Sequence, residues 1–160
     1  MSVEKYIQPF VDVTKNVFRE FIGAEPEAGR PYFSSAEAVN EWDISAVIGL
    51  TGEASGAVVV SMKTGLAEKL TDTLTGKNHD SIDDEVVDAI GEIVNIIAGN
   101  AKKGLEEAFR LVISLPTIIQ GPAHQIRWPS EKARIICIPF TIYNTEVFTL
   151  SVAIESARSV

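Results

Sequence analysis

Glu92 and Asn95 place a carboxylate and an amide three residues apart near the middle of the sequence. If this segment is helical, side chains three or four residues apart are neighbours, so the two can reach one target together. Asp88 lies four residues before Glu92 and Gly99 lies four residues after Asn95, which extends the same helical stripe in both directions. From spacing alone, a solvated helix face is the commoner explanation. A polar surface that contacts another molecule is the alternative.

A long amphipathic helix is predicted over residues 81–107, and it would carry this polar stripe. Ser81 and Asp84 match a capping box, and acidic residues at the start of the helix suit the positive end of its dipole. The apolar positions recur at helical spacing and would face a core. They are Val86, Ile90, Ile93, Val94, Ile97, Ala101 and Leu105.

Gly99 lies inside this predicted helix, where a glycine costs about 1 kcal/mol relative to alanine. Its place one turn beyond Asn95 indicates that another molecule comes close there. Gly91 and Gly104 lie in the same helix and allow a second interpretation, because a glycine also permits tight packing against the protein's own sheet. Both interpretations stay open at the level of sequence.

Two further helices and a set of strands are predicted around the long helix. Residues 3–22 and 64–74 have helical periodicity, and Gly23 and Gly76 follow them as terminators. Pro139 lacks an N–H for a strand ladder, so an edge, a bulge or a strand break is expected there. Residues 24–31 are expected to form a loop. Strands are expected over residues 42–50, 56–62, 111–119, 125–128, 133–143 and 146–155, with a loop at 51–55 and a turn around Asn144.

The composition is that of one globular domain spanning residues 1–160, since 46 % of the residues are hydrophobic and 22 % are charged. The 14 basic and 22 acidic residues give a net charge of −8, which argues against binding to a nucleic-acid backbone. No apolar run is long enough to cross a bilayer, and residues 1–23 are too charged for a signal peptide. A cytoplasmic protein is therefore expected.

Other chemistries find little support in the sequence. His79 and His124 lie far apart in expected loops, where both should be solvated, which argues against a zinc site. Cys137 lies in an apolar run and is expected to be a buried thiol without a disulfide partner. Residues 51–56 lack the Lys-Ser/Thr pair of a phosphate loop, and no Gly-x-Ser-x-Gly elbow occurs. Nucleotide binding and serine hydrolysis are therefore not expected.

A degenerate internal duplication is indicated, because a long helix followed by a hairpin is predicted over residues 3–62 and again over 81–155. When the two helices are aligned so that Asp12 matches Asp88, Asn16 takes the place of Glu92 and Arg19 takes the place of Asn95. The first half therefore lacks the pair.

The run Asp88-x-x-x-Glu92-x-x-Asn95 resembles the motif of the CheC/CheX chemotaxis phosphatases, which carry a Glu-x-x-Asn pair on a long helix with a proline further along. Pro116 takes the place of that proline here. CheC proteins carry the pair on both long helices and CheX-type proteins carry it once, so this chain resembles the CheX type. The resemblance covers nearly the whole chain and implies one active surface per chain.

This resemblance implies an α/β (α+β) fold, in which an antiparallel sheet packs against two long helices and the halves are pseudo-duplicated. It implies a phosphatase that hydrolyses the aspartyl phosphate of a CheY-like response regulator. Asn95 would orient the attacking water, as a glutamine does in some GTPases, and Glu92 would dock the regulator through a lysine. Asp88 and Gly99 would border the contact. The regulator would supply Mg²⁺, and this chain would need no cofactor of its own.

The resemblance also implies a homodimer formed through sheet edges, for which residues 135–142 and 147–154 are the candidate strands. The alternative function is that of a non-catalytic adaptor, which would bind a response regulator or a flagellar switch component through the same helix. A small-molecule-binding or structural domain would have no affinity for any receiver protein.

Overall fold

The computed structural model of this chain describes residues 4–34, 41–106, 110–126, 128 and 134–156. Its helical segments are α1 (Glu4–Val17), the π-helical turn η1 (Phe18–Ile22) that continues it, α2 (Thr64–Thr75) and α3 (Asp84–Leu105). Its strands are β1 (Glu27–Ala28), β2 (Tyr32–Ser34), β3 (Ile44–Gly52), β4 (Ala54–Met62), β5 (Leu111–Ile113), β6 (Thr117–Gln120), β7 (Ile135–Ile142) and β8 (Glu146–Ser156).

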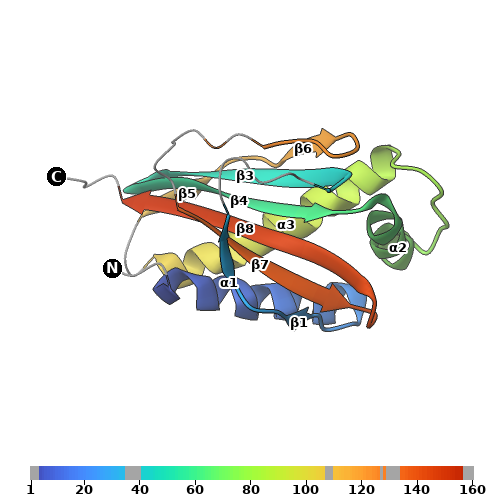
Figure 1. Ribbon diagram of the computed structural model, residues 1–160, viewed down its shortest axis with the longest axis horizontal. Helices are drawn as coiled ribbons and strands as arrows, with labels where there is room; N and C mark the ends of the chain where they lie inside the picture. The colour runs from blue at the N-terminus through green and yellow to red at the C-terminus, as the bar shows by residue number, and fades with distance from the viewer. Residues whose placement is uncertain (1–3, 35–40, 107–109, 127, 129–133, 157–160) are drawn as a thin grey trace.

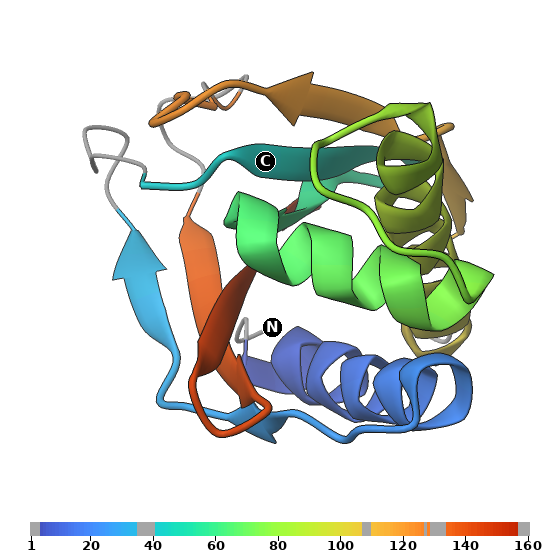
Figure 2. The same cartoon turned by 90° about the vertical axis from the view of Figure 1, so that its right-hand side faces the viewer.

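The strands form one antiparallel sheet with the order β1-β7-β8-β4-β3-β5, to which β2 is added on β7 and β6 on β3 (Figure 1). Side chains alternate between the two faces of a strand, and Ile44, Ala46 and Ile48 of β3 are fully buried on the face that packs against the helices. The three α-helices all contribute to the core on this face, where α1 and α3 pack against each other (Figure 2). The expected antiparallel α+β fold is confirmed.

The order of elements repeats between the two halves of the chain. The hairpin β3–β4 follows α1, the hairpin β7–β8 follows α3, and β4 pairs with β8 in the middle of the sheet. The short strands are exchanged, since β1 and β2 of the first half pair with β7, and β5 and β6 of the second half pair with β3. The predicted pseudo-duplication is therefore present in the topology.

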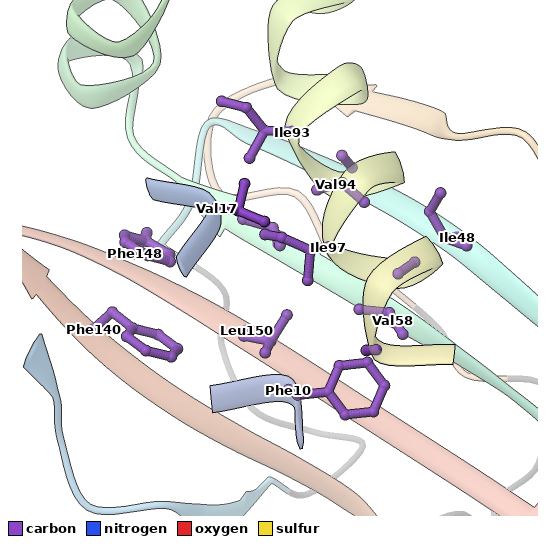
Figure 3. Packing of buried hydrophobic residues seen from close by; sticks show 14 of the residues in the cluster. Phe10, Val17, Ile48, Val58, Ile93, Val94, Ile97, Phe140, Phe148 and Leu150 are labelled. Carbon is purple, nitrogen blue, oxygen red and sulfur yellow. The ribbon is translucent and has the colours of Figure 1, made fainter. Parts of the chain in front are cut away.

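Aromatic side chains join the helical layer to the sheet. The rings of Phe18 and Phe148 stack with their centroids 4.8 Å apart, and Phe140 stacks on Phe148 at 5.1 Å. Phe10 of α1 and Ile97 of α3 belong to the same buried cluster (Figure 3). Truncation of one such aromatic side chain costs about 3–5 kcal/mol of stability, so this packing determines where the long helices lie on the sheet.

The ends of the long helices have identifiable causes. The first helix ends before Gly23 as predicted, because Gly23 adopts the left-handed conformation with φ of 80°. The third helix begins at Asp84, so the prediction of a capping box at Ser81 was wrong. Its N-cap is Asp83, whose carboxylate accepts a hydrogen bond from the Val86 N–H at 3.0 Å.

The turn between β3 and β4 is tighter than the loop predicted over residues 51–55. Both strands extend into that segment, and Glu53 alone separates them. The Glu53 N–H donates to the Arg110 carbonyl at 2.9 Å. Gly52 is required beside it, because its φ is 122° and an added Cβ would lie 2.4 Å from the Arg110 carbonyl oxygen. The turn is therefore held by a segment distant in sequence.

Two strand predictions need correction. The strand expected over residues 111–119 is divided into β5 and β6, with residues 114–116 outside both. The strand expected over residues 125–128 is not formed at 125, 126 or 128, and position 127 lies outside the described residues. In the first segment Pro116 removes a donor that a continuous ladder over residues 111–119 would need.

Pro139 stays inside β7, where it pairs with Thr149 of β8. On its other side the neighbouring chain is interrupted between β1 and β2, and the Gly29 N–H donates to the Pro139 carbonyl at 2.7 Å. The expected strand break therefore lies in the partner strand. Because β7 and β8 are paired on both sides, the prediction that they supply a free edge was wrong.

Candidate functional site

Glu92 and Asn95 lie on the surface of α3 that faces away from the buried core residues. Glu92 and Asp88 are exposed and Asn95 is half-buried, whereas Ile93 and Val94 between the pair are buried. In the part of the chain that the structure describes, no hydrogen bond or ion pair occupies the side chains of Asp88, Glu92 or Asn95. The helix therefore presents on one side a carboxylate and an amide that have no hydrogen-bond or ion-pair partner within the described residues; we call such side chains uncommitted.

The three glycines of α3 have different neighbours. A Cβ added at Gly104 would lie 3.2 Å from Cβ of Pro9, so this glycine permits close packing on α1 and not on the sheet that the second interpretation named. A Cβ at Gly91 would lie 3.5 Å from Cγ of Pro116, which is an ordinary contact. A Cβ at Gly99 would meet only a methyl group of Ile113, at 3.9 Å. The fold itself does not require glycine at position 99.

A β-bulge lies over residues 114–116, where the pairing of β3 passes from β5 to β6. Two residues of β3, Ile48 and Gly49, face these three, so the broken strand carries one extra residue. The Ser114 hydroxyl accepts a hydrogen bond from the Gly49 N–H at 2.8 Å and donates to the Leu115 carbonyl at 2.9 Å. These bonds fix the bulge against the central sheet.

The bulge lies at the level of Asn95. Gly91 and Gly99 are one turn before and one turn after Asn95 on the same stripe of the helix. Gly91 faces Pro116 after the bulge, and Gly99 faces Ile113 before it. Asn95, midway between the two glycines, therefore lies at the level of residues 114 and 115. The motif proline, Pro116, packs against the same helix face.

His79 ties the start of α3 to α2. Its Nδ1 lies 2.8 Å from the Asp72 carboxylate of α2, and its Nε2 lies 3.4 Å from the Glu85 carboxylate of α3. The hydrogen bond to Asp72, together with Glu85 and the nearby charge of Asp83, raises the pKa of His79 above its usual value, although burial opposes this. The side chain is 3 % exposed, so the prediction of a solvated loop histidine was wrong.

The corresponding stripe of the first helix is occupied by its own hydrogen bonds. Asp12 accepts a hydrogen bond from the Gln8 amide at 2.8 Å. Arg19 donates to the Asn16 amide oxygen and forms an ion pair with Glu25 at 3.5 Å. The uncommitted side chains of α3 therefore have no counterpart at the aligned positions of α1.

His124 also differs from its prediction. Its Nδ1 donates to the Gly121 carbonyl at 2.8 Å, which leaves Nε2 to accept from the Ser45 hydroxyl at 2.6 Å. Ser45 in turn lies 2.6 Å from the Ser61 hydroxyl, and both serines are buried. This histidine is a half-buried structural group on the sheet face opposite the helices.

Residues that could hold a metal ion do not gather within the described ranges, where no group of three or more His, Cys, Asp or Glu has suitable geometry. Across the same ranges, no helix combines the length and the apolarity needed to span a membrane. Cys137 is buried, as predicted, and its thiol lies 3.3 Å from the Ser151 hydroxyl.

Comparison with known proteins relates the chain to one family. Residues 44–141, more than half of the chain, match the family described as Chemotaxis phosphatase CheX. A relative from Thermotoga maritima, the CheY-P phosphatase CheX, is 25 % identical over 154 residues, which cover 95 % of this chain and 97 % of the relative.

Solved structures give the same relation. The chemotaxis protein CheX from Desulfovibrio desulfuricans is 31 % identical with a TM-score of 0.84, covering 94 % of this chain and 99 % of that one. The structure of a CheX-CheY-BeF₃-Mg²⁺ complex from Borrelia burgdorferi matches with a TM-score of 0.78 and 26 % identity, covering 94 % of this chain and 98 % of that one.

Proposed function

Because this chain belongs to the CheX family of chemotaxis phosphatases, we propose that it hydrolyses the aspartyl phosphate of a CheY-like response regulator. The observation that carries the proposal is the uncommitted pair on α3, the exposed Glu92 and the half-buried Asn95. The described elements act together as one CheX-like domain. Its related proteins include one described as a CheY-P phosphatase and one solved together with CheY.

Asn95 orients the water that attacks the phosphorus. An amide offers one acceptor and two donors, and it does not titrate, so it can hold a water in one orientation over a wide pH range. In phosphoryl transfer the enzyme contributes mainly positioning and charge stabilisation. A rigid helix, with Ile93 and Val94 buried beside the amide, keeps Asn95 in a fixed place relative to the regulator.

Glu92 docks the regulator by pairing with a lysine of the regulator's active site, which sets Asn95 in register with the phosphoryl group. Asp88 and Gly99 border this contact. The regulator supplies the Mg²⁺ of the reaction, and the related complex solved as CheX-CheY-BeF₃-Mg²⁺ supports this assignment. When bound there, Mg²⁺ neutralises charge on the phosphoryl oxygens.

We propose that the activity takes place in the cytoplasm.

We also propose a homodimer formed through a sheet edge. The outer strands of the described sheet are β1–β2 on one side and β5–β6 on the other. Light scattering at several concentrations tests this, and a mass corresponding to one 17.4 kDa chain throughout would contradict it.

The activity is tested by phosphate release from a phosphorylated CheY-like regulator with and without this protein. The wild type is expected to accelerate release. Asn95→Ala should lower that acceleration about 100-fold, because catalysis depends on the position of the water. Glu92→Ala should raise KM about two- to fivefold with a smaller change in kcat, because it removes a docking charge whose exposed ion pair contributes about 1 kcal/mol or less.

Asn100→Ala is the matched control, since it removes the same amide from an exposed position of the same helix. It should behave as the wild type. Binding without acceleration would identify the protein as an adaptor and refute the phosphatase. Equal losses in Asn95→Ala and Asn100→Ala would refute the role of Asn95.

A further inference from the structure

We propose that Leu115 is an apolar anchor that docks the response regulator beside the Glu92–Asn95 pair. This inference rests on the proposed function, and it adds to it a second contact formed by a different part of the chain. The partner chemistry is a receiver surface that presents an apolar side chain next to its phosphorylated carboxylate.

Leu115 is unusually exposed for a residue that is held so firmly. Leu115 is 86 % exposed, the highest value among the large apolar residues that the structure describes as exposed. Single exposed apolar residues are ordinary at a protein surface and need no explanation when they lie on a mobile loop. Leu115 instead lies inside a bulge that is bonded on both sides.

The bulge holds Leu115 through both of its neighbours. Ser114 is joined to Gly49 of β3 by two hydrogen bonds, one from the Ser114 N–H to the Gly49 carbonyl at 2.9 Å and one from the Gly49 N–H to the Ser114 hydroxyl at 2.8 Å. The hydroxyl also donates to the Leu115 carbonyl. Pro116 restricts the backbone on the other side and packs against Gly91 of α3. A leucine fixed in this way loses little conformational freedom when a partner covers it.

The same bulge lies beside the catalytic pair. Gly91 faces Pro116 and Gly99 faces Ile113, so Asn95, midway between the two glycines, lies at the level of the residues between Ile113 and Pro116. A regulator surface that covers Asn95 and extends toward β5 and β6 therefore also contacts the bulge. Bulges occur preferentially next to active sites, where they redirect a side chain.

An apolar anchor complements what the polar pair supplies. Exposed ion pairs such as that proposed for Glu92 give orientation and little affinity. Affinity in protein interfaces comes mainly from a few side chains that become fully desolvated. Leu115 is the described exposed apolar residue at the level of Asn95, so it is the residue placed to supply this contribution.

Val112 offers a matched control on the same broken strand. It is 64 % exposed and apolar, but it lies in β5 between Leu111 and Ile113, both of which pack toward the core. Because successive side chains of a strand alternate, Val112 faces away from α3. It shares the strand and the exposure of Leu115 but not its place beside Asn95.

The test compares wild type, Leu115→Ser, Leu115→Met and Val112→Ser in binding to a beryllofluoride-activated CheY-like regulator with Mg²⁺, by titration calorimetry, and in phosphate release. Leu115→Ser should weaken Kd roughly tenfold, because burial of a leucine contributes on that scale. It should raise KM to a similar extent and leave kcat unchanged. Leu115→Met and Val112→Ser should both stay within about twofold of the wild type.

Several results would overturn the proposal. These are an unchanged Kd in Leu115→Ser, an equal loss in Val112→Ser, or a loss in Leu115→Met as large as that in Leu115→Ser. A Leu115→Ser variant that changes from dimer to monomer with unchanged regulator affinity would assign the leucine to a contact between copies of this chain. A wild type that binds without hydrolysis would refute the phosphatase alone, and the Kd comparison would still decide the role of Leu115. A wild type that binds no receiver would overturn both.

Discussion

Gly99 lies inside α3 at a position where contacts within its own chain do not require a glycine. A Cβ at this position would meet only Ile113, at an ordinary distance of 3.9 Å, and alanine is favoured over glycine inside a helix by about 1 kcal/mol. We therefore expect Gly99→Ala to raise the free energy of unfolding by roughly 0.5–1 kcal/mol. If the regulator approaches the helix here, the same methyl group should weaken regulator binding several-fold.

Gly91→Ala provides the comparison, because Gly91 lies in the same helix but is covered by Pro116. Chemical denaturation of both variants measures stability, and titration with activated regulator measures affinity. Gly91→Ala should leave affinity unchanged. Unchanged affinity in Gly99→Ala would mean that the regulator does not come close at this turn, and Gly99 would then have no role in the contact.

At the level of single residues, the sequence predicted what depends on local spacing. Glu92 and Asn95 share a helix, so their proximity follows from the helical repeat alone. His79 and His124 were wrongly predicted as solvated, because each bonds a side chain of another element. Asp72 lies only seven residues before His79, but on α2, and Ser45 of β3 lies 79 residues from His124. The repeat of a single helix or strand relates neither pair.

At the level of elements, His79 acts as a clamp between α2 and the start of α3. It lies between Asp72 and Glu85, and Lys77 also pairs with Glu85 at 3.7 Å. The folded state binds the proton of His79 more tightly than the unfolded state, since its pKa is raised chiefly by Asp72. The resulting stabilisation is fully present below the unfolded pKa of about 6.5, and it is lost as the pH rises through the folded pKa.

His79→Gln should remove this pH dependence, because glutamine can still donate to Asp72 but does not titrate. Denaturation of both proteins between about pH 6 and about pH 8.5 isolates the effect, since all other titrating groups are shared. The stability advantage of the wild type over His79→Gln should decrease as the pH rises above about 6.5. A constant difference, or one that grows with pH, would contradict the clamp.

The sequence predicted the helices and hairpins well but missed the interruption that matters for the site. Long helices and paired apolar runs follow from periodicity, and α1, α3, β3–β4 and β7–β8 were predicted for that reason. Residues 114–116 were predicted as part of one strand. Pro116 was the available signal, because proline cannot donate to a ladder, but a strand break alone does not say which helix the bulge will face. The place of the bulge beside α3 follows from the pairing of β3 with β5 and β6 and from the contacts of α3 with Ile113 and Pro116.

At the level of the whole molecule, the two halves have the same topology, but their long helices carry different polar side chains at the aligned positions. The exchanged short strands make α1 and α3 equivalent in position. On the first helix, however, Asn16 and Arg19 are bonded to each other and Asp12 is bonded to Gln8. Arg19 also lies in the π-helical turn η1, in which the Gly23 N–H donates to the Phe18 carbonyl at 3.0 Å. The wider turn changes the angle around the helix axis between Asn16 and Arg19. Side chains three residues apart are therefore oriented differently there than in α3.

A chain with the pair moved to α1 tests whether side chains or helix geometry restrict activity to one surface. The variant carries Asn16→Glu and Arg19→Asn together with Asn95→Ala, which removes the original water-positioning amide. Loss of the exposed Arg19–Glu25 ion pair should cost at most about 1 kcal/mol, so the variant should fold. We expect phosphate release to stay at the level of Asn95→Ala alone. The substitutions at positions 16 and 19 in a chain that keeps Asn95 should leave the wild-type rate unchanged. Release above the Asn95→Ala level would show that α1 can act as a second surface, and that the two replaced side chains, not the π-helical turn, keep it inactive.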